Sequence, residues 1–199
     1  MDQKEKSCKS RAGILALAFR EFAEKGYDRA SLNALCAANG LPKGLLYYYF
    51  KDKDALYLAC LEECFSCIAA YLQQHLPPPP LQPEAYFDLR LQFFRAHPYH
   101  QQLFCQAVVH PPRHLAARIR QCKKPLDEWN GQVLAAILSG RPLAAGHTLD
   151  SAVRQLRLFE DYLNASFALA GSGFPTAEEQ DRLCREALRT MLYGLIARG

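Results

Sequence analysis

The sequence predicts an all-α protein with about nine helices. Apolar residues recur at helical spacing nearly everywhere, and no stretch alternates cleanly between apolar and polar residues as a strand would. Glycine and proline fall between the periodic segments, where they end one helix and begin the next. The chain has 199 residues, half of them apolar and 22% charged, which is typical of a globular protein with a sizeable core.

Four helices are expected in the first 75 residues. The first covers 10–25, because apolar side chains recur on one face there and Gly26 supplies a stop. Ser31 caps a short second helix, which ends at Asn39-Gly40. Pro42 lies in the first turn of a third helix that runs to about Phe50. Asp52 caps the fourth, which covers 53–75 and stops at four consecutive prolines.

The rest of the chain is cut by proline and glycine into five further helices. Thr148 is expected to cap the fourth of these, after a loop over 141–149. The expected helices cover residues 83–96, 98–109, 112–139, 148–171 and 176–197.

Residues 31–53 form a predicted helix-turn-helix, with the turn at Asn39-Gly40-Leu41. The second helix of this motif enters the DNA major groove with its N-terminal residues foremost. Lys43 there can reach a phosphate or a guanine edge, and Gly44 allows a close approach of the backbone. Spacing alone leaves open an ordinary pair of packed helices. The apolar residues expected to hold the pair are Leu32, Leu35, Leu41, Leu46 and Phe50.

Tyrosines and lysines continue the same surface. Tyr47, Tyr48 and Tyr49 offer hydroxyls to phosphate oxygens and ring faces to thymine methyl groups. Lys51 and Lys53 begin the next helix beside the DNA backbone, where positive charge adds affinity without sequence information. Residues 1–54 carry ten Lys/Arg against seven Asp/Glu, whereas 55–199 carry fourteen against thirteen, so most of the excess positive charge lies with this motif.

Residues 11–54 resemble the N-terminal domain of the tetracycline-repressor (TetR/AcrR) family of bacterial regulators. The resemblance rests on Phe22-Ala23-Glu24-Lys25-Gly26-Tyr27, on the Ser31 cap and on the run from Gly40 to Lys53. It implies that an operator contacts Ser31, Pro42, Lys43, Gly44, Tyr47, Tyr48, Tyr49 and Lys53.

Two of these positions depart from the usual family pattern. Pro42 stands where serine or threonine is common, so one contact between a hydroxyl and a phosphate is expected to be absent. Tyr49 stands where histidine is usual, which is expected to change the preferred operator without abolishing binding.

The resemblance divides the chain into a DNA-binding domain, 1–54, and an effector-binding and dimerisation domain, 55–199. It implies a homodimeric regulator, expected to be a repressor that a small molecule releases from double-stranded operator DNA. Broad apolar faces on the last two helices fit a dimer interface. Aromatic and polar side chains that could line an effector pocket are Phe65, Phe94, Phe104, Gln106, His110, Trp129, Phe159 and Tyr162, although plain core packing explains each of them as well.

Two alternatives stay open from the sequence. Cys60, Cys64 and Cys67 lie on one face of a helix, so a thiol- or metal-sensing regulator is possible, although buried structural cysteines are commoner. The other is a helical interaction protein that does not bind DNA. No phosphate-binding glycine loop or nucleophile motif appears, so neither an enzyme nor a cofactor is expected.

The sequence also predicts a cytoplasmic protein. Its N-terminus lacks the apolar run of an export signal. The longest uncharged stretch, 64–83, ends in a proline-rich segment that cannot cross a membrane as a helix. Eight cysteines without an export signal are expected to be reduced thiols.

Overall fold

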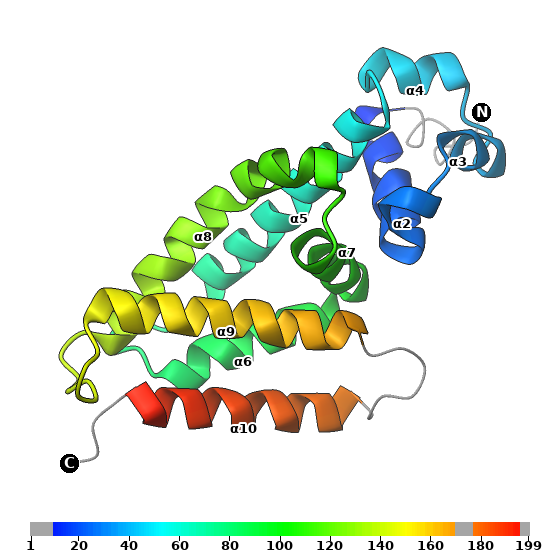
Figure 1. Ribbon diagram of the computed structural model, residues 1–199. Coiled ribbons are helices and arrows are strands. Elements are labelled where there is room, and N and C mark those ends of the chain that lie inside the picture. The colour runs from blue at the N-terminus through cyan, green and yellow to red at the C-terminus, as the bar shows by residue number, and fades with distance from the viewer. Residues whose placement is uncertain (1–9, 170–176, 196–199) are drawn as a thin grey trace. The chain divides into compact units, whose positions relative to one another are not determined.

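A computed structural model describes residues 10–169 and 177–195, and the prediction of an all-α protein is confirmed (Figure 1). These residues form nine α-helices and one 3-10 helix, with no β-strand among them. The elements are α2 (Arg11–Arg29), α3 (Leu32–Ala38), α4 (Lys43–Tyr49), α5 (Lys53–His75), α6 (Pro83–Ala96), α7 (Pro98–Val109), η1 (Arg113–Leu115), α8 (Ala116–Leu138), α9 (Leu149–Leu169) and α10 (Ala177–Leu195).

Helix capping by side chains fixes several of these boundaries, as the sequence predicts. The Ser31 hydroxyl accepts a hydrogen bond from the Ala34 amide at 3.3 Å, and the Asp52 carboxylate accepts one from the Ala55 amide at 2.7 Å. At the start of α9, the Thr148 hydroxyl accepts from the Ser151 amide at 3.2 Å. Each cap satisfies an amide that the first helical turn leaves without a helical partner.

Two helix starts differ from the expected ones. Pro42 lies outside α4 as its N-cap residue, because its ψ of 126° is extended rather than helical. The helix expected over 112–139 begins instead with η1, and α8 starts at Ala116. Pro112 is likewise extended, with φ −53° and ψ 125°, so the chain enters the helix only after it.

Gly26 interrupts α2, as the sequence predicts. Its φ of 75° and ψ of 167° lie in a region that only glycine readily occupies, and a short helical segment continues to Arg29. The range Arg11–Arg29 is therefore two helical segments joined at Gly26, and the first of them ends where it was expected to end.

We expect Gly26→Ala to lower the free energy of unfolding by about 1–3 kcal/mol, because a Cβ atom makes this backbone conformation strained. The cost comes from the backbone, since an added Cβ would approach no atom closer than 3.7 Å. Gly131→Ala in α8 is the control: it lacks a positive φ, has open space around it, and should be neutral or stabilising. Urea denaturation measures both, and equal effects at the two positions would contradict the prediction.

The chain divides into two compact units, and each is described separately. The first unit comprises Met1–Ser66 and His97–Lys123, and thus contains α2 to α4, α7, η1 and the beginnings of α5 and α8. The second comprises Cys67–Ala96 and Lys124–Gly199. The functional division into 1–54 and 55–199 stays a prediction, because compactness does not show which residues bind which partner.

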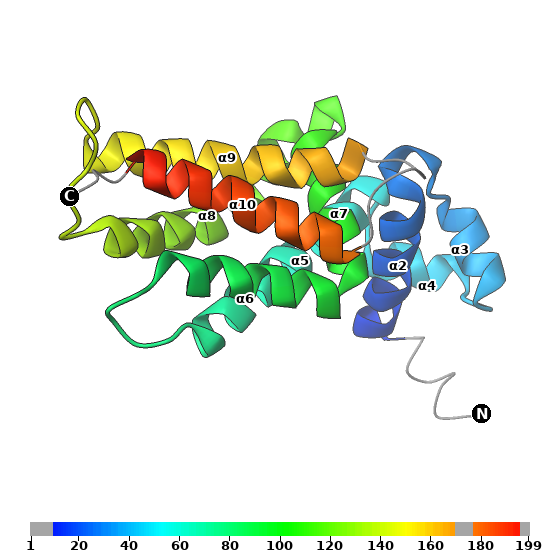
Figure 2. The same cartoon turned by 90° about the horizontal axis from the view of Figure 1, so that it is seen from below.

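Each unit has its own apolar core. In the first, Phe22 contacts Tyr57 edge to face, with ring centroids 4.9 Å apart, and both side chains are almost completely buried. In the second, α9 and α10 lie side by side, and α6 also packs against α10 (Figures 1 and 2). The core of the second unit contains Tyr86, Phe87, Val133, Leu134, Ile137, Leu138, Ala152, Leu156 and Leu192.

Helix α5 is long and apolar enough to cross a membrane by length and composition. Half of the residues in its most apolar window are buried inside the fold. Because core helices of water-soluble proteins have the same properties, this is weak evidence for a membrane segment.

Candidate nucleic-acid interface

Helices α3 and α4 are held by a tight turn and a shared apolar layer. Gly40 has a φ of 58°, which favours glycine, and the Leu41 amide donates to the Cys36 carbonyl at 2.9 Å. Leu35, Leu41, Leu46 and Phe50 are buried, whereas Leu32 is partly exposed. Four of the five residues predicted to hold the two helices together are thus buried between α4 and the rest of the unit.

The opposite face of α4 is exposed. Lys43 and Gly44 lie in its first turn, and both are exposed. Tyr48 is 79% exposed, whereas Leu46 on the buried face is 0% exposed. Tyr47 and Tyr49 are also exposed, and the Tyr49 ring lies edge-on to Tyr48 with centroids 5.0 Å apart. A basic residue, a glycine and three aromatic hydroxyls therefore lie together on a short, supported helix, as direct contact with DNA requires.

Pro42 and Ser31 lie at the starts of the two helices. The Pro42 carbonyl accepts hydrogen bonds from the Leu45 and Leu46 amides at 3.0 and 3.3 Å, while its ring is exposed. Ser31 is exposed as well, but its hydroxyl already accepts from the Ala34 amide. A phosphate contact by that hydroxyl would therefore use its own proton as the donor.

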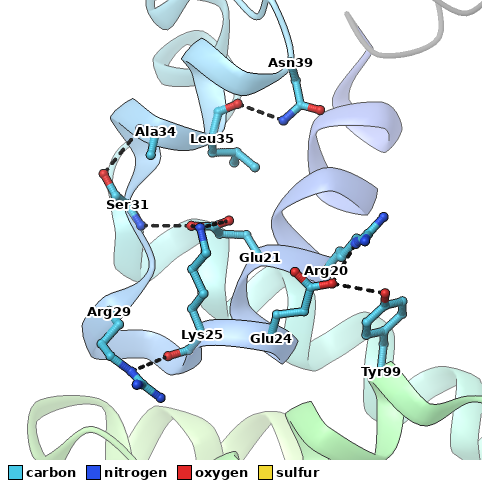
Figure 3. A network of polar contacts seen from close by, with 10 residues as sticks. All are labelled: Arg20, Glu21, Glu24, Lys25, Arg29, Ser31, Ala34, Leu35, Asn39 and Tyr99. Atoms are coloured by element: carbon cyan, nitrogen blue, oxygen red, sulfur yellow. Dashed lines mark hydrogen bonds and ion pairs between the residues drawn. The ribbon is translucent and has the colours of Figure 1, made fainter.

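Glu21 positions the Ser31 backbone, which the sequence did not indicate (Figure 3). Its carboxylate accepts a hydrogen bond from the Ser31 amide at 3.3 Å and forms an ion pair with Lys25 at 2.8 Å. Ten residues separate Glu21 from Ser31, so no local motif joins them. Only the approach of α2 to the start of α3 shows the contact.

Lys53 is held inside the first unit rather than extended into solvent. Its ammonium group lies 4.5 Å from the centre of the Tyr27 ring and donates to the Asp28 carbonyl at 3.3 Å. The side chain is only partly exposed. To contact a phosphate, the Lys53 ammonium would have to leave Tyr27 and Asp28 or bind the phosphate in addition to them. Lys51 is exposed and needs no such change.

A polar cluster lies next to Lys53, at the start of α5. The Tyr27 hydroxyl donates to the Asp54 carboxylate, and His114 of η1 approaches the same carboxylate at 3.2 Å. The hydrogen bond from Tyr27 lowers the pKa of Asp54, with His114 and Arg118 acting in the same direction and burial opposing them. Burial, together with Asp54, raises the pKa of Tyr27 to about 12. This cluster joins three elements far apart in the sequence.

We expect Asp54 to stabilise the fold in a pH-dependent way. Because its pKa in the folded state lies below its ordinary value of 3.8, its contribution is present above that value and is lost as the pH falls through the lowered pKa. The stability difference between the wild type and Asp54→Asn should therefore shrink below pH 3.8. Urea denaturation across this range measures it. Tyr27→Phe should move the loss to higher pH, and an unchanged profile in both variants would contradict the assignment.

Comparisons with known proteins match the same part of the chain. The sequence model of the family "Bacterial regulatory proteins, tetR family" matches residues 14–60, a range that includes both helices and Lys53. This chain carries a TetR-family domain over residues 14–60. It is a helix-turn-helix transcriptional regulator with the helical fold of that family.

Two relatives and one solved structure show how far the similarity of this TetR-family regulator extends. The HTH-type transcriptional repressor Rv1474c of Mycobacterium tuberculosis is 43% identical over 60 residues, which cover 30% of this chain and 32% of Rv1474c. The HTH-type transcriptional regulator RutR of Escherichia coli is 24% identical over 92% of both chains. The structure of FadR from Bacillus subtilis has a TM-score of 0.72 at 13% identity, covering 91% of this chain and 97% of FadR, and shows a shared fold.

The predicted effector residues lie in both compact units. Phe65 and Phe104 are buried in the first, where their ring centroids are 5.8 Å apart. The Gln106 amide donates to the Ala23 carbonyl of α2 at 2.8 Å, and His110 is exposed at the end of α7. Three of these residues serve the core and helix contacts of the first unit, and His110 is exposed, so a role in an effector pocket stays a prediction for all four.

The other four belong to the second unit. Phe94 is buried, and Trp129 and Phe159 are partly buried against the apolar core. The side chain of Tyr162 lies outside the described residues. Phe94, Trp129 and Phe159 therefore lie in a different unit from Phe65 and Phe104.

Two cysteines of the predicted stripe resemble structural thiols, whereas Cys67 is partly exposed. Cys60 and Cys64 are buried and donate to the carbonyls of Leu15 and His100 at 3.8 and 3.5 Å. Burial raises the pKa of Cys60, and it raises the pKa of Cys105 to about 12. Such thiols stay protonated and react slowly with oxidants. Among the residues whose side chains the structure describes, no group of three or more His, Cys, Asp or Glu could hold a metal ion.

Proposed function

We propose that this regulator is a homodimeric cytoplasmic repressor that binds double-stranded operator DNA through α4 and leaves it when a small molecule binds in residues 55–199. The observation that carries the proposal is the exposed face of Lys43, Gly44 and the three tyrosines on a helix whose other face is anchored by Leu46. Its role is regulatory rather than catalytic.

A two-fold dimer would present two α4 helices to the two halves of a near-palindromic operator. The α9–α10 pair supports this part of the proposal. An open groove of about 410 Å³ lies along it, and its apolar lining includes Phe159, Ala187 and Met191. Leu158 is 68% exposed and Tyr193 is 52% exposed, so these two side chains add apolar surface that a second copy of the chain would cover.

Part of the expected apolar stripe on the last helix faces inward. Leu192 is buried in the core of the second unit, and Met191 packs partly against it. The side chains of Leu188 and Leu195, and the whole of Ile196, lie outside the described residues. The proposed dimer surface is therefore centred on Leu158, Met191 and Tyr193.

The dimer is tested with Leu158→Asp and Tyr193→Asp together. We expect the double variant to sediment as a monomer and to bind operator DNA at least about tenfold more weakly, because a single helix-turn-helix contacts only one half-site. Leu149→Asp, at the exposed start of α9, is the matched control. Sedimentation of the wild type as a monomer would refute the dimer.

Release by a small molecule requires the effector to bind more tightly to an arrangement that does not fit DNA. Two observations support such coupling. Helix α7 is tied to α2 by the bond from Gln106 to the Ala23 carbonyl and by the bond from the Tyr99 hydroxyl to Glu24 at 3.1 Å (Figure 3 shows the second). FadR, which shares this fold, is described in complex with stearoyl-CoA.

DNA binding is tested by selecting sequences from a random duplex pool with the purified full chain. The proposal expects one enriched sequence family, bound more weakly as salt rises, because lysine contacts with phosphate release counterions. A selection that enriches no sequence would refute operator binding and favour a helical interaction protein.

A further inference from the structure

A cavity of about 120 Å³ lies between α6 and α10 in the second unit. Part of its lining is apolar and belongs to the core, since Phe87 of α6 is 4% exposed and Leu192 of α10 is 3% exposed. The other four residues that line it are charged: Glu84, Asp88, Arg185 and Arg189. A hollow that combines apolar side chains with a few charged groups has the composition of a small-molecule site.

The four charged residues form two opposing pairs, one on each side of the cavity. The two helices run antiparallel (Figure 2), and Asp88 of α6 lies opposite Arg185 of α10, with a carboxylate oxygen 2.7 Å from the Arg185 Nη1. Glu84 lies one turn before Asp88 on α6, and Arg189 lies one turn after Arg185 on α10. In an antiparallel pair of helices, Glu84 and Arg189 therefore also lie opposite each other, and both line the cavity.

The first pair is closed by its ion pair, whereas the second pair is open. Within the part of the chain that the structure describes, no ion pair joins Glu84 to Arg189, and both side chains are exposed. A ligand with one positive and one negative charge would pair with both residues at once. A ligand with a single charge would pair with one of them and meet a like charge on the other, which is unfavourable. The charges of the cavity therefore favour a zwitterion.

We propose that this cavity binds an α-amino acid with a compact apolar side chain. The Arg189 guanidinium would donate two parallel hydrogen bonds to its carboxylate, and its ammonium group would donate to Glu84. Its side chain would pack on Phe87 and Leu192. An engineered cavity of about 150 Å³ holds benzene, so a cavity of about 120 Å³ has room for a branched side chain of three or four carbons. Because the cavity lies in residues 55–199, the amino acid would be the effector, and this part of the inference rests on the proposed function.

Calorimetry on the full chain tests the site with matched ligands. L-leucine is compared with 3-methylbutylamine, which lacks the carboxylate, and with 4-methylpentanoate, which lacks the amine. L-valine is compared in the same way with isobutylamine and 3-methylbutanoate. We expect at least one amino acid to bind about tenfold more tightly than either of its analogues, which is the lower end for charge-assisted hydrogen bonds, because Glu84 and Arg189 are exposed to water.

The two charged residues of the open pair predict different losses. Arg189→Met should abolish the advantage of the amino acid over the amine and leave its advantage over the carboxylate, whereas Glu84→Gln should do the reverse. Arg182→Met, at an exposed position of α10 that does not line the cavity, should behave like the wild type. All three side chains are exposed, so these substitutions remove no core packing and the variants should fold.

Three results would overturn the proposal: binding of neither amino acid, equal binding of an amino acid and its analogues, or a preference that survives in both variants. Fluorescence anisotropy measures operator binding separately, and the bound amino acid should weaken it at least about fivefold. Operator binding that the bound amino acid leaves unchanged would overturn the effector assignment. A wild type that selects no DNA yet binds the amino acid in the expected pattern would refute the proposed repressor and leave the site standing.

Discussion

Lys43→Ala is expected to bind operator DNA about 5- to 150-fold more weakly than the wild type, equivalent to about 1–3 kcal/mol. Lys43 is exposed in the first turn of α4, and Leu46 beneath it anchors the helix, so the substitution removes a charge without disturbing the core. Fluorescence anisotropy with an operator from the selection, repeated at several salt concentrations, measures the effect.

The salt series also shows which DNA group Lys43 contacts. If Lys43 contacts a phosphate, its removal weakens binding equally on all sequences and reduces the dependence of log affinity on log salt concentration by about one. If it contacts a guanine edge, its removal relaxes specificity at one base pair. Lys124→Ala, at an exposed position in α8, removes the same charge outside the helix-turn-helix. Equal weakening by the two substitutions would show only a loss of net charge, and the assigned contact would be wrong.

Phe22→Ala is expected to lower the free energy of unfolding by about 3–5 kcal/mol, a large part of the about 5–15 kcal/mol that holds an ordinary domain folded. Phe22 is 1% exposed and stacks with Tyr27 as well as contacting Tyr57. Removing the ring leaves a cavity beneath the junction of α2 and α5. Thermal and urea denaturation, followed by circular dichroism, measure the loss.

Leu149→Ala provides the comparison for this substitution, because Leu149 is 38% exposed, lies outside the proposed dimer surface, and its truncation should change stability by less than about 0.5 kcal/mol. Operator binding by Phe22→Ala should fall together with the folded fraction and recover at low temperature. Full stability with lost DNA binding would place Phe22 in a role other than the core.

The amino-acid sequence by itself determined the helical class, most helix boundaries and which face of α4 is exposed. Ser31, Asp52 and Thr148 cap the helices they were expected to cap, because a cap acts within four residues of its own position. The exposed face of α4 follows from local spacing in the same way, since Leu46 and Phe50 are buried while Tyr47 and Tyr48 are not. Local patterns of this kind need no knowledge of distant contacts.

Tertiary structure decided the partners of those local elements. The contact of Glu21 with the Ser31 amide joins residues ten positions apart, and the approach of His114 to Asp54 joins residues sixty positions apart. No periodicity encodes such pairs, because they depend on how whole helices cross. The same reason explains why Lys53, which was expected to face DNA, lies against Tyr27. It also explains why the sequence did not identify Arg90 of α6 and Asn130 of α8 as buried, since only the packing of these two helices removes their polar side chains from water.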